Sequence, residues 1–326
     1  MRICLVRLSA LGDIVMCLPL IRTLQKNFPE AEITWVIGKP FYPLLEKLEG
    51  VRFIVVPKVK SWGDLRRARA LLKPYQFDVL LATQASFSAH ILYSCISAKR
   101  KIGYDKFRSK DFHGFFVDER IEFHREHTVE GFLRFAKTIG AKEMSFDGSI
   151  PTAEKSKIEP PYFVINPCSS KIEKDWDYAN YPAIIRYVKE VFGIEAVLTG
   201  APSDRAVCDQ IEKEAPCINL CGKTTLQELA AVLQRAKFVL SPDTGPAHIA
   251  SSIGTPVIGL FAPTSPLLTG PYFAQEHLID KHPEVLARYA TSKRNWNVRI
   301  YHKEAMNLIT IDDVQEKITQ CMKLKG

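Results

Sequence analysis

The stretch Ser241-Pro-Asp-Thr-Gly-Pro-Ala-His248 decides the fold of the second half of the chain. The apolar run 237–240 before it predicts a short strand, and the run 249–253 after it predicts a helix. Gly245 and the proline after it suit the first turn of that helix. Free amides and a partial positive charge at a helix start favour a phosphate. An ordinary helix capped by Asp243 accounts for the same residues when they are taken alone.

Outward from this stretch, predicted strands and helices alternate in both halves of the chain. In the second half the strands are 162–165, 196–199, 218–220, 238–240 and 257–261, with helices at 181–192, 204–214, 226–235 and 246–253. In the first half the strands are 3–8, 33–37, 53–56, 77–82 and 101–104, with helices at 14–27, 42–48, 65–72 and 88–97. Apolar strands separated by helices indicate an α/β fold, with a parallel sheet covered on both faces.

A break at 149–161, which holds three prolines and few apolar residues, separates the two series. We therefore expect two domains, 1–155 and 156–326, with sheets that face each other across a cleft. Ligands bind beyond the carboxyl ends of parallel strands, so the cleft is the expected site. A terminal helix at 311–322 is expected to be able to pack back on the first domain.

The positive charge is confined to the first half. The chain has 326 residues and a net charge of +8. Residues 1–150 hold 24 basic and 16 acidic residues, whereas residues 151–326 hold 20 of each. This distribution indicates an anionic partner: nucleic acid, an acidic membrane surface or a phosphorylated substrate. The eight cysteines are scattered without a CxxC pair, which predicts buried thiols in a reducing cytoplasm.

The loop after the first strand reads Ser9-Ala-Leu-Gly-Asp13. It lacks the GxGxxG pattern of dinucleotide-binding turns. Asp13 either caps the helix that follows or is a general base held at the cleft. The residues alone leave both interpretations open.

Polar loops also follow the strands of the second half. The loop from Asn166 to Trp176 holds Ser169, Ser170 and Lys174, which either grip a diphosphate or form a polar surface loop. Asp204 lies at a predicted helix start, where it either caps the helix or binds a ribose. The loop 221–226 resembles a P-loop fragment but lacks its upstream glycine.

Four features together resemble a known family over nearly the whole chain. They are Ser9-Ala-Leu-Gly-Asp13 with Pro19; Ser169-Ser170 with Lys174 and Trp176; Gly200-Ala-Pro-Ser-Asp204; and Asp243-Thr-Gly-Pro-Ala-His248 with Gly254-Thr-Pro256 and Pro263-Thr264. In their order and spacing they are similar to the lipopolysaccharide heptosyltransferases of glycosyltransferase family 9. The resemblance implies the GT-B fold, with two Rossmann-like domains. It also implies inverting transfer of L-glycero-D-manno-heptose from ADP-heptose to the Kdo/heptose inner core of lipopolysaccharide.

The resemblance also assigns roles to individual residues. Asp13 matches the family's proposed base, which deprotonates the acceptor hydroxyl. The donor-binding residues that it implies are Ser169, Ser170 and Lys174 at the phosphates, Asp204 at the ribose, Thr244 and Gly245 at the diphosphate, Asp243 near the sugar, and the motif histidine His248. The family often has two threonines where this chain has Ser169 and Ser170, and the hydroxyl groups are kept.

Two basic clusters fit an acceptor that carries Kdo carboxylates and lipid A phosphates. One comprises Lys58, Lys60, Arg66, Arg67 and Arg69; the other includes Lys101 and Arg108. A solvated helix or loop face is the alternative interpretation of each cluster. We expect a cytoplasmic monomer at the cytoplasmic face of the inner membrane. We also expect no tightly bound cofactor and no required divalent metal.

Three other functions remain as alternatives. A nucleic-acid-binding protein is suggested by the charge alone. The sequence offers no recognisable reader motif and no aromatic stacking platform near the basic clusters, so we expect no nucleic-acid partner. A sugar-nucleotide epimerase could share the same cleft. Another nucleotide-sugar transferase of the same fold would differ from a heptosyltransferase only in its substrates.

Overall fold

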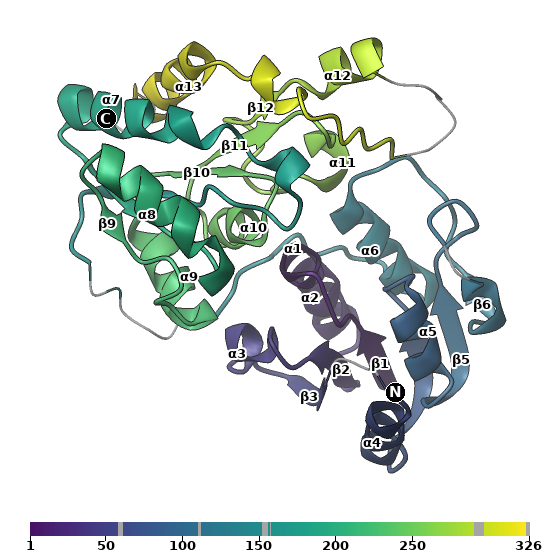
Figure 1. Ribbon diagram of the computed structural model, residues 1–326. Coiled ribbons are helices and arrows are strands. Elements are labelled where there is room, and N and C mark those ends of the chain that lie inside the picture. Colours follow the sequence, from purple (N-terminus) through teal and green to yellow (C-terminus); the bar gives the residue numbers. More distant parts are fainter. Residues whose placement is uncertain (58–60, 110–111, 152–155, 157, 290–296, 324–326) are drawn as a thin grey trace. The chain divides into compact units, whose positions relative to one another are not determined.

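The computed structural model describes residues 1–57, 61–109, 112–151, 156, 158–289 and 297–323. Two compact units make up the chain, Met1–Pro151 and Thr152–Gly326. Each unit contains a six-stranded sheet in which all paired strands run parallel (Figure 1). The expected α/β class with two parallel sheets is confirmed. Within the described residues, no helix is long and apolar enough to cross a membrane.

The first unit has the strand order β3-β2-β1-β4-β5-β6. Its strands are β1 Arg2–Val6, β2 Glu32–Gly38, β3 Val51–Val56, β4 Gln76–Leu81, β5 Ser97–Gly103 and β6 Glu119–Arg120. Its helices are α1 Leu11–Met16, α2 Leu18–Asn27, α3 Tyr42–Leu45, α4 Trp62–Leu72, α5 Phe87–Tyr93 and α6 Thr128–Thr138, with the 3-10 turn η1 His113–Phe115. The helix expected at 14–27 is instead two helices. They meet at Cys17, and Pro19 occupies the first turn of α2.

The second unit repeats this arrangement, with the order β12-β11-β10-β7-β8-β9. Its strands are β7 Tyr162–Ile165, β8 Glu195–Leu198, β9 Ile218–Asn219, β10 Val239–Pro242, β11 Val257–Phe261 and β12 Ile279–Asp280. Its helices are α7 Tyr181–Phe192, α8 Arg205–Glu214, α9 Leu226–Arg235, α10 Gly245–Ser252, α11 Pro266–Thr269, α12 His282–Tyr289 and α13 Ile311–Lys323, with 3-10 turns η2 Ile172–Lys174, η3 Tyr178–Asn180, η4 Pro202–Asp204 and η5 Met306–Leu308. The terminal helix α13 packs against α7, β11 and β12 of its own unit.

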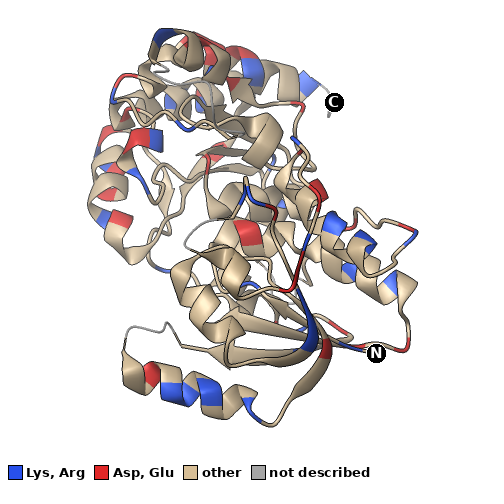
Figure 2. Ribbon diagram, turned by 90° about the vertical axis from the view of Figure 1, so that its right-hand side faces the viewer, with Lys and Arg blue, Asp and Glu red and all other residues tan. Residues whose placement is uncertain are grey.

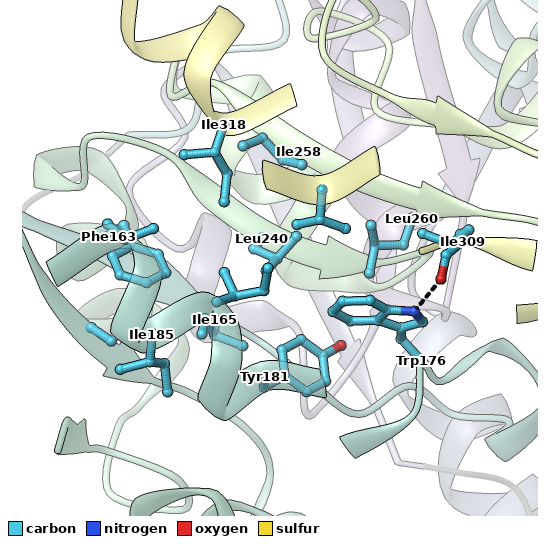
Figure 3. Close-up of a cluster of buried hydrophobic side chains, with 14 of the residues drawn as sticks. Phe163, Ile165, Trp176, Tyr181, Ile185, Leu240, Ile258, Leu260, Ile309 and Ile318 are labelled. Atoms are coloured by element: carbon cyan, nitrogen blue, oxygen red, sulfur yellow. Dashed lines mark hydrogen bonds between the residues drawn. The ribbon is translucent and has the colours of Figure 1, made fainter. Parts of the chain in front are cut away.

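A core of fully buried side chains fixes the loop that follows β7. Every residue of β7 is buried, as expected for a central strand covered on both faces. Trp176, at the end of the loop, packs edge-on against Tyr181 with ring centroids 5.3 Å apart. Its indole N–H donates to the Ile309 carbonyl at 2.8 Å (Figure 3). This anchor holds the end of the segment that carries Lys174. All eight cysteines are thiols and six are buried, in agreement with the sequence prediction.

The strand orders locate a candidate site in each unit. The first and fourth strands of each sheet are neighbours: β1 beside β4, and β7 beside β10. The chain leaves the first strand toward one edge of the sheet and leaves the fourth toward the other edge. Loops therefore diverge at the carboxyl ends of these strands, where open α/β sheets bind ligands.

Candidate functional site

The turn from β10 into α10 leaves the start of a helix open. Thr244 is the N-cap residue and has an extended backbone, but its side chain makes no capping hydrogen bond. Its buried hydroxyl lies 2.7 Å from the Ser241 hydroxyl instead. Pro246 in the first turn has no amide hydrogen to satisfy. The first-turn amides of α10, starting at Gly245, are therefore left to an outside acceptor such as a phosphate.

Lys174 and Asp243 meet where the loops after β7 and β10 diverge. The Lys174 ammonium donates to the Asp243 carbonyl at 2.6 Å and to its carboxylate Oδ2 at 3.2 Å. Both side chains are largely buried. An ammonium has three N–H groups, so one donor of Lys174 remains after these two contacts. The contact thus places the Lys174 ammonium beside the start of α10.

Asp243 also faces two other side chains. Thr264, which follows β11, donates its hydroxyl to Oδ2 at 3.1 Å, and His248 Nε2 lies 3.8 Å from Oδ1. Burial by itself raises the pKa of Asp243, but the contact with His248 and the charge of Lys174 outweigh it and lower the pKa to about 2. Asp243 is therefore an anion held by three side chains. Thr264 belongs to one of the sequence motifs, but no pattern in the sequence indicated its contact with Asp243.

The other predicted donor-binding residues lie on the neighbouring loops of the second unit. The Ser169 hydroxyl donates to the Lys171 carbonyl at 2.6 Å and shapes its own loop, whereas Ser170 is exposed. Asp204 accepts the Ala201 amide at 2.8 Å and closes the turn before α8. A carboxylate has about four acceptor positions, so Asp204 keeps capacity for a ribose hydroxyl.

Asp13 lies in the first turn of α1, at the carboxyl end of β1. The N-cap of this helix is Ala10, whose amide donates to the Asp13 carboxylate at 3.3 Å. Asp13 therefore contributes to the helix start, as the capping interpretation expected. Its carboxylate also forms an ion pair with Arg7 and is about one-third exposed. An oriented, partly exposed carboxylate is what a general base requires.

Arg7 forms an ion pair with Asp13 and was not among the site residues predicted from the sequence. Its guanidinium is mostly buried, donates to the Thr83 carbonyl at 2.5 Å, and lies 5.5 Å from the centroid of the Phe132 ring. Gln84, after β4, accepts the Leu8 amide at 2.8 Å and so ties the loops after β1 and β4 together. An arginine directly after a buried apolar strand was the available signal, because such a charge needs a partner.

The basic residues predicted to bind the acceptor do not form one surface. Lys58 and Lys60 lie outside the described residues. Arg66, Arg67 and Arg69 are exposed on α4, and Arg67 is paired with Asp64 at 2.5 Å. Lys101 is only half-buried, and its ammonium donates to the Tyr93 carbonyl at 3.0 Å.

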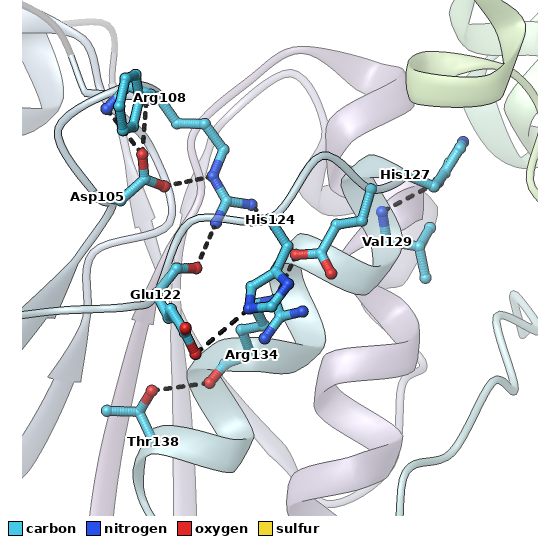
Figure 4. A network of polar contacts seen from close by, with 10 residues as sticks. Asp105, Arg108, Glu122, His124, His127, Val129, Arg134 and Thr138 are labelled. Carbon is cyan, nitrogen blue, oxygen red and sulfur yellow. Dashed lines mark hydrogen bonds and ion pairs between the residues drawn. The ribbon is translucent and has the colours of Figure 1, made fainter. Parts of the chain in front are cut away.

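Arg108 corrects the surface assignment of the second cluster. Its side chain is buried and pairs with Asp105 at 2.5 Å and with Glu126 at 3.5 Å (Figure 4). It also donates to the Glu122 carbonyl at 3.0 Å. A guanidinium with these partners stabilises the loop before α6 and is not presented to a ligand. No group of three or more potential metal ligands occurs among the described side chains.

Comparison with known proteins places the chain in a family. The model of glycosyltransferase family 9 (heptosyltransferase) matches residues 65–296. A Haemophilus influenzae protein, lipopolysaccharide core heptosyltransferase OpsX, is 34% identical, with 99% of this chain and 96% of the relative covered. The chain belongs to glycosyltransferase family 9. The resemblance inferred from the sequence motifs is confirmed, and this family member is a glycosyltransferase.

Solved structures show that the glycosyltransferase has the GT-B fold. A glycosyl transferase family 9 protein from Veillonella parvula aligns with a TM-score of 0.80 at 21% identity, covering 100% of this chain and 98% of the other. The E. coli heptosyltransferase WaaC with ADP aligns with a TM-score of 0.76 at 21% identity, covering 98% and 100%. At these identities the likeness concerns the fold, and the expected fold class is confirmed.

Proposed function

We propose that the chain transfers L-glycero-D-manno-heptose from ADP-heptose to the inner core of lipopolysaccharide, with inversion at the anomeric carbon. Membership of the heptosyltransferase family establishes the class of enzyme. One observation carries the assignment of the donor site: Lys174 and the open start of α10 meet around Asp243. Structures of E. coli heptosyltransferase WaaC, which shares the fold, contain ADP or ADP-2-deoxy-2-fluoro heptose, and they support an ADP-sugar donor.

In the proposed reaction the second unit stabilises the leaving group. The diphosphate of the donor lies at the first-turn amides of α10, where Thr244 and Gly245 form the turn, and accepts the remaining N–H of Lys174. The helix amides and the Lys174 ammonium stabilise the negative charge that develops as the bond from the sugar to ADP breaks. Ser170 and Asp204 bind the phosphates and the ribose. Because these groups supply positive charge, we propose that the rate does not depend on a divalent metal.

In the proposed reaction Asp13 is the general base. It takes the proton of the acceptor hydroxyl as that oxygen attacks the anomeric carbon from the face opposite ADP, which inverts the configuration. Arg7 orients the carboxylate for this step. Because the acceptor is a lipid, we place the enzyme at the cytoplasmic face of the inner membrane. We propose that it acts there as a monomer.

A donor screen tests this proposal. The purified chain is given ADP-heptose, and in parallel GDP- and UDP-sugars, with a deep-truncated lipopolysaccharide core as acceptor. Of the nucleotide sugars tested, we expect only ADP-heptose to be turned over. Release of ADP should require the acceptor and should be unchanged by EDTA. Turnover with a UDP- or GDP-sugar would refute the assigned donor. Isomerisation of a nucleotide sugar without acceptor would replace the proposal by an epimerase.

A further inference from the structure

Among the described residues, the most exposed aromatic side chains belong to the first unit. Phe115 is 85% exposed, Trp62 84% and Phe112 77%, and Phe87 is also exposed. In the described part of the second unit, the one exposed large aromatic residue is Phe273, at 41%. Exposed aromatic residues thus follow the same division as the positive charge. Several such side chains on one surface indicate an interaction site.

These residues lie on one continuous layer of the first unit. Trp62 and Phe87 begin α4 and α5, which pack against each other. The turn η1 packs on α5, because His113 contacts His90 of that helix at 2.9 Å. Phe112 and Phe115 flank that histidine in the sequence, with ring centroids 6.1 Å apart. We call the set Trp62, Phe87, Phe112 and Phe115 the aromatic face.

Basic residues border the aromatic face. Exposed cations on α4 and directly after it are Arg66, Arg67, Arg69 and Lys73. The one acidic residue of α4, Asp64, is paired with Arg67. Figure 2 shows α4 as a mainly basic helix. The guanidinium of exposed Arg120 lies against Gly114 of η1, while α5 and η1 contain no Asp, Glu, Lys or Arg.

Phe112 has a backbone conformation that a bulky residue rarely adopts. Its φ angle is +61°, in the left-handed region. Among the described residues, every other residue with a positive φ is a glycine. Glycine fits this conformation without steric cost, whereas a side chain with a Cβ is strained there. The fold buries little of this strained phenylalanine, whose ring lies beside that of Phe115. Its side chain is thus available for an external contact.

We propose that the aromatic face docks on the surface of an anionic phospholipid bilayer. Tryptophan and phenylalanine rings partition into the boundary between head groups and acyl chains, and arginines beside them meet the phosphates. A duplex nucleic-acid backbone would need the cations without a projecting apolar surface. Single-stranded nucleic acid stacks its bases on aromatic rings, so binding of a single-stranded oligonucleotide in place of vesicles would overturn the inference. The inference takes from the proposed function only that the acceptor lies in a membrane.

Vesicle sedimentation with the full-length chain, without donor or acceptor, tests the inference. We expect binding to vesicles of phosphatidylcholine mixed with phosphatidylglycerol and weak binding to phosphatidylcholine alone. Phe112→Gly should lower the affinity at least about tenfold, since the variant loses the apolar surface that the ring buries in the bilayer. Because glycine suits φ +61°, this variant should keep or raise its melting temperature. Phe115→Ser should have a similar effect on binding.

Two further variants separate the contributions. Arg66→Gln with Arg69→Gln should weaken binding about fivefold for each residue, since a basic side chain near an anionic bilayer contributes about 1 kcal/mol. Phe146→Ser, which alters an exposed phenylalanine outside the aromatic face, is the matched control and should bind as the wild type does. Absence of vesicle binding by the wild-type chain, or unchanged binding by Phe112→Gly and Phe115→Ser, would overturn the inference.

One other outcome would assign a different partner to the aromatic face. Dimers in light scattering that Phe115→Ser dissociates, without vesicle binding, would assign the face to a second copy of the chain and overturn the inference. The proposed function is judged separately, by turnover of a deacylated, soluble acceptor. Phe112→Gly should leave that rate unchanged. Failure of vesicle binding and failure of heptose transfer are therefore distinguishable.

Discussion

Replacing Asp243 by asparagine should destabilise the second unit by about 2 kcal/mol at neutral pH. The pKa of this carboxyl is lowered from 3.8 to about 2 in the folded chain. Each pKa unit corresponds to about 1.36 kcal/mol of preference for the ionised form, which gives about 2 kcal/mol in total. The side chain is largely buried, so solvent screens this contribution only slightly. The uncharged amide of asparagine forfeits it.

The same argument fixes how the effect depends on pH. The folded-state pKa lies below that of the unfolded chain, so the stabilisation is complete above about pH 4 and is lost as the pH falls through 2. Urea unfolding of the wild type and Asp243→Asn is compared at pH 7, 5 and 3. The difference between the two proteins should be constant from pH 7 to 5 and fall to about half at pH 3.

A double-mutant cycle assigns the effect to the partner. Lys174→Met removes the ammonium that donates to Asp243 and keeps a side chain of similar length. If the pair is responsible, the double variant Lys174→Met, Asp243→Asn should be more stable than the sum of the two single losses predicts. The reasoning is refuted if Asp243→Asn costs under about 0.5 kcal/mol or costs the same at pH 7 and 3.

Three further predictions follow from the first unit. Asp13→Asn should keep the melting temperature and the ADP affinity but lose about 10²–10⁴-fold in kcat, measured as ADP release at saturating substrates. A near wild-type rate would leave Asp13 only its structural contacts with the Ala10 amide and with Arg7. Arg7→Met should lower kcat with little change in donor KM, and Arg7→Lys should recover part of it, because lysine can still face Asp13; equal kcat values for Met and Lys would contradict the orienting role. Burial and the neighbouring His90 lower the pKa of His113 to about 4, so the free energy of unfolding should fall by about 3 kcal/mol as the pH drops from 6.5 to 4. In thermal melts at several pH values, His113→Gln should depend less on pH over that range.

The alternation of apolar runs predicted five strands of each sheet, because the central strands of a parallel sheet are apolar on both faces. It missed the two-residue edge strands β6 and β12, which carry no such run. It did not predict α6, although Phe132 and Phe135 are buried there. The helix expected at 14–27 is interrupted at Cys17, and Pro19, visible in the sequence, was not used to place the break.

The loops of the candidate site were predicted in part. Strand ends located Asp13, Lys174 and Asp243, since parallel strands present their carboxyl ends at one edge. A single sequence does not show which distant residues form ion pairs. Arg108 was therefore interpreted as a surface cation, whereas in the fold it pairs with Glu126, which is 18 positions away. Arg7 and Asp13 are close in the sequence, but their contact depends on the turn between β1 and α1.

The repeated strand order has an evolutionary consequence. Arg7, Asp13 and Thr83 come from one unit, while Lys174, Asp243 and Thr264 come from the other. Each constellation is assembled by its own sheet, so substitutions can accumulate around one without disturbing the supports of the other. If the ligands bind as proposed, recognition of a new acceptor can evolve while binding of the nucleotide is retained. Exchange of whole halves between relatives at the Pro151–Thr152 boundary is a rational route to enzymes with recombined substrates.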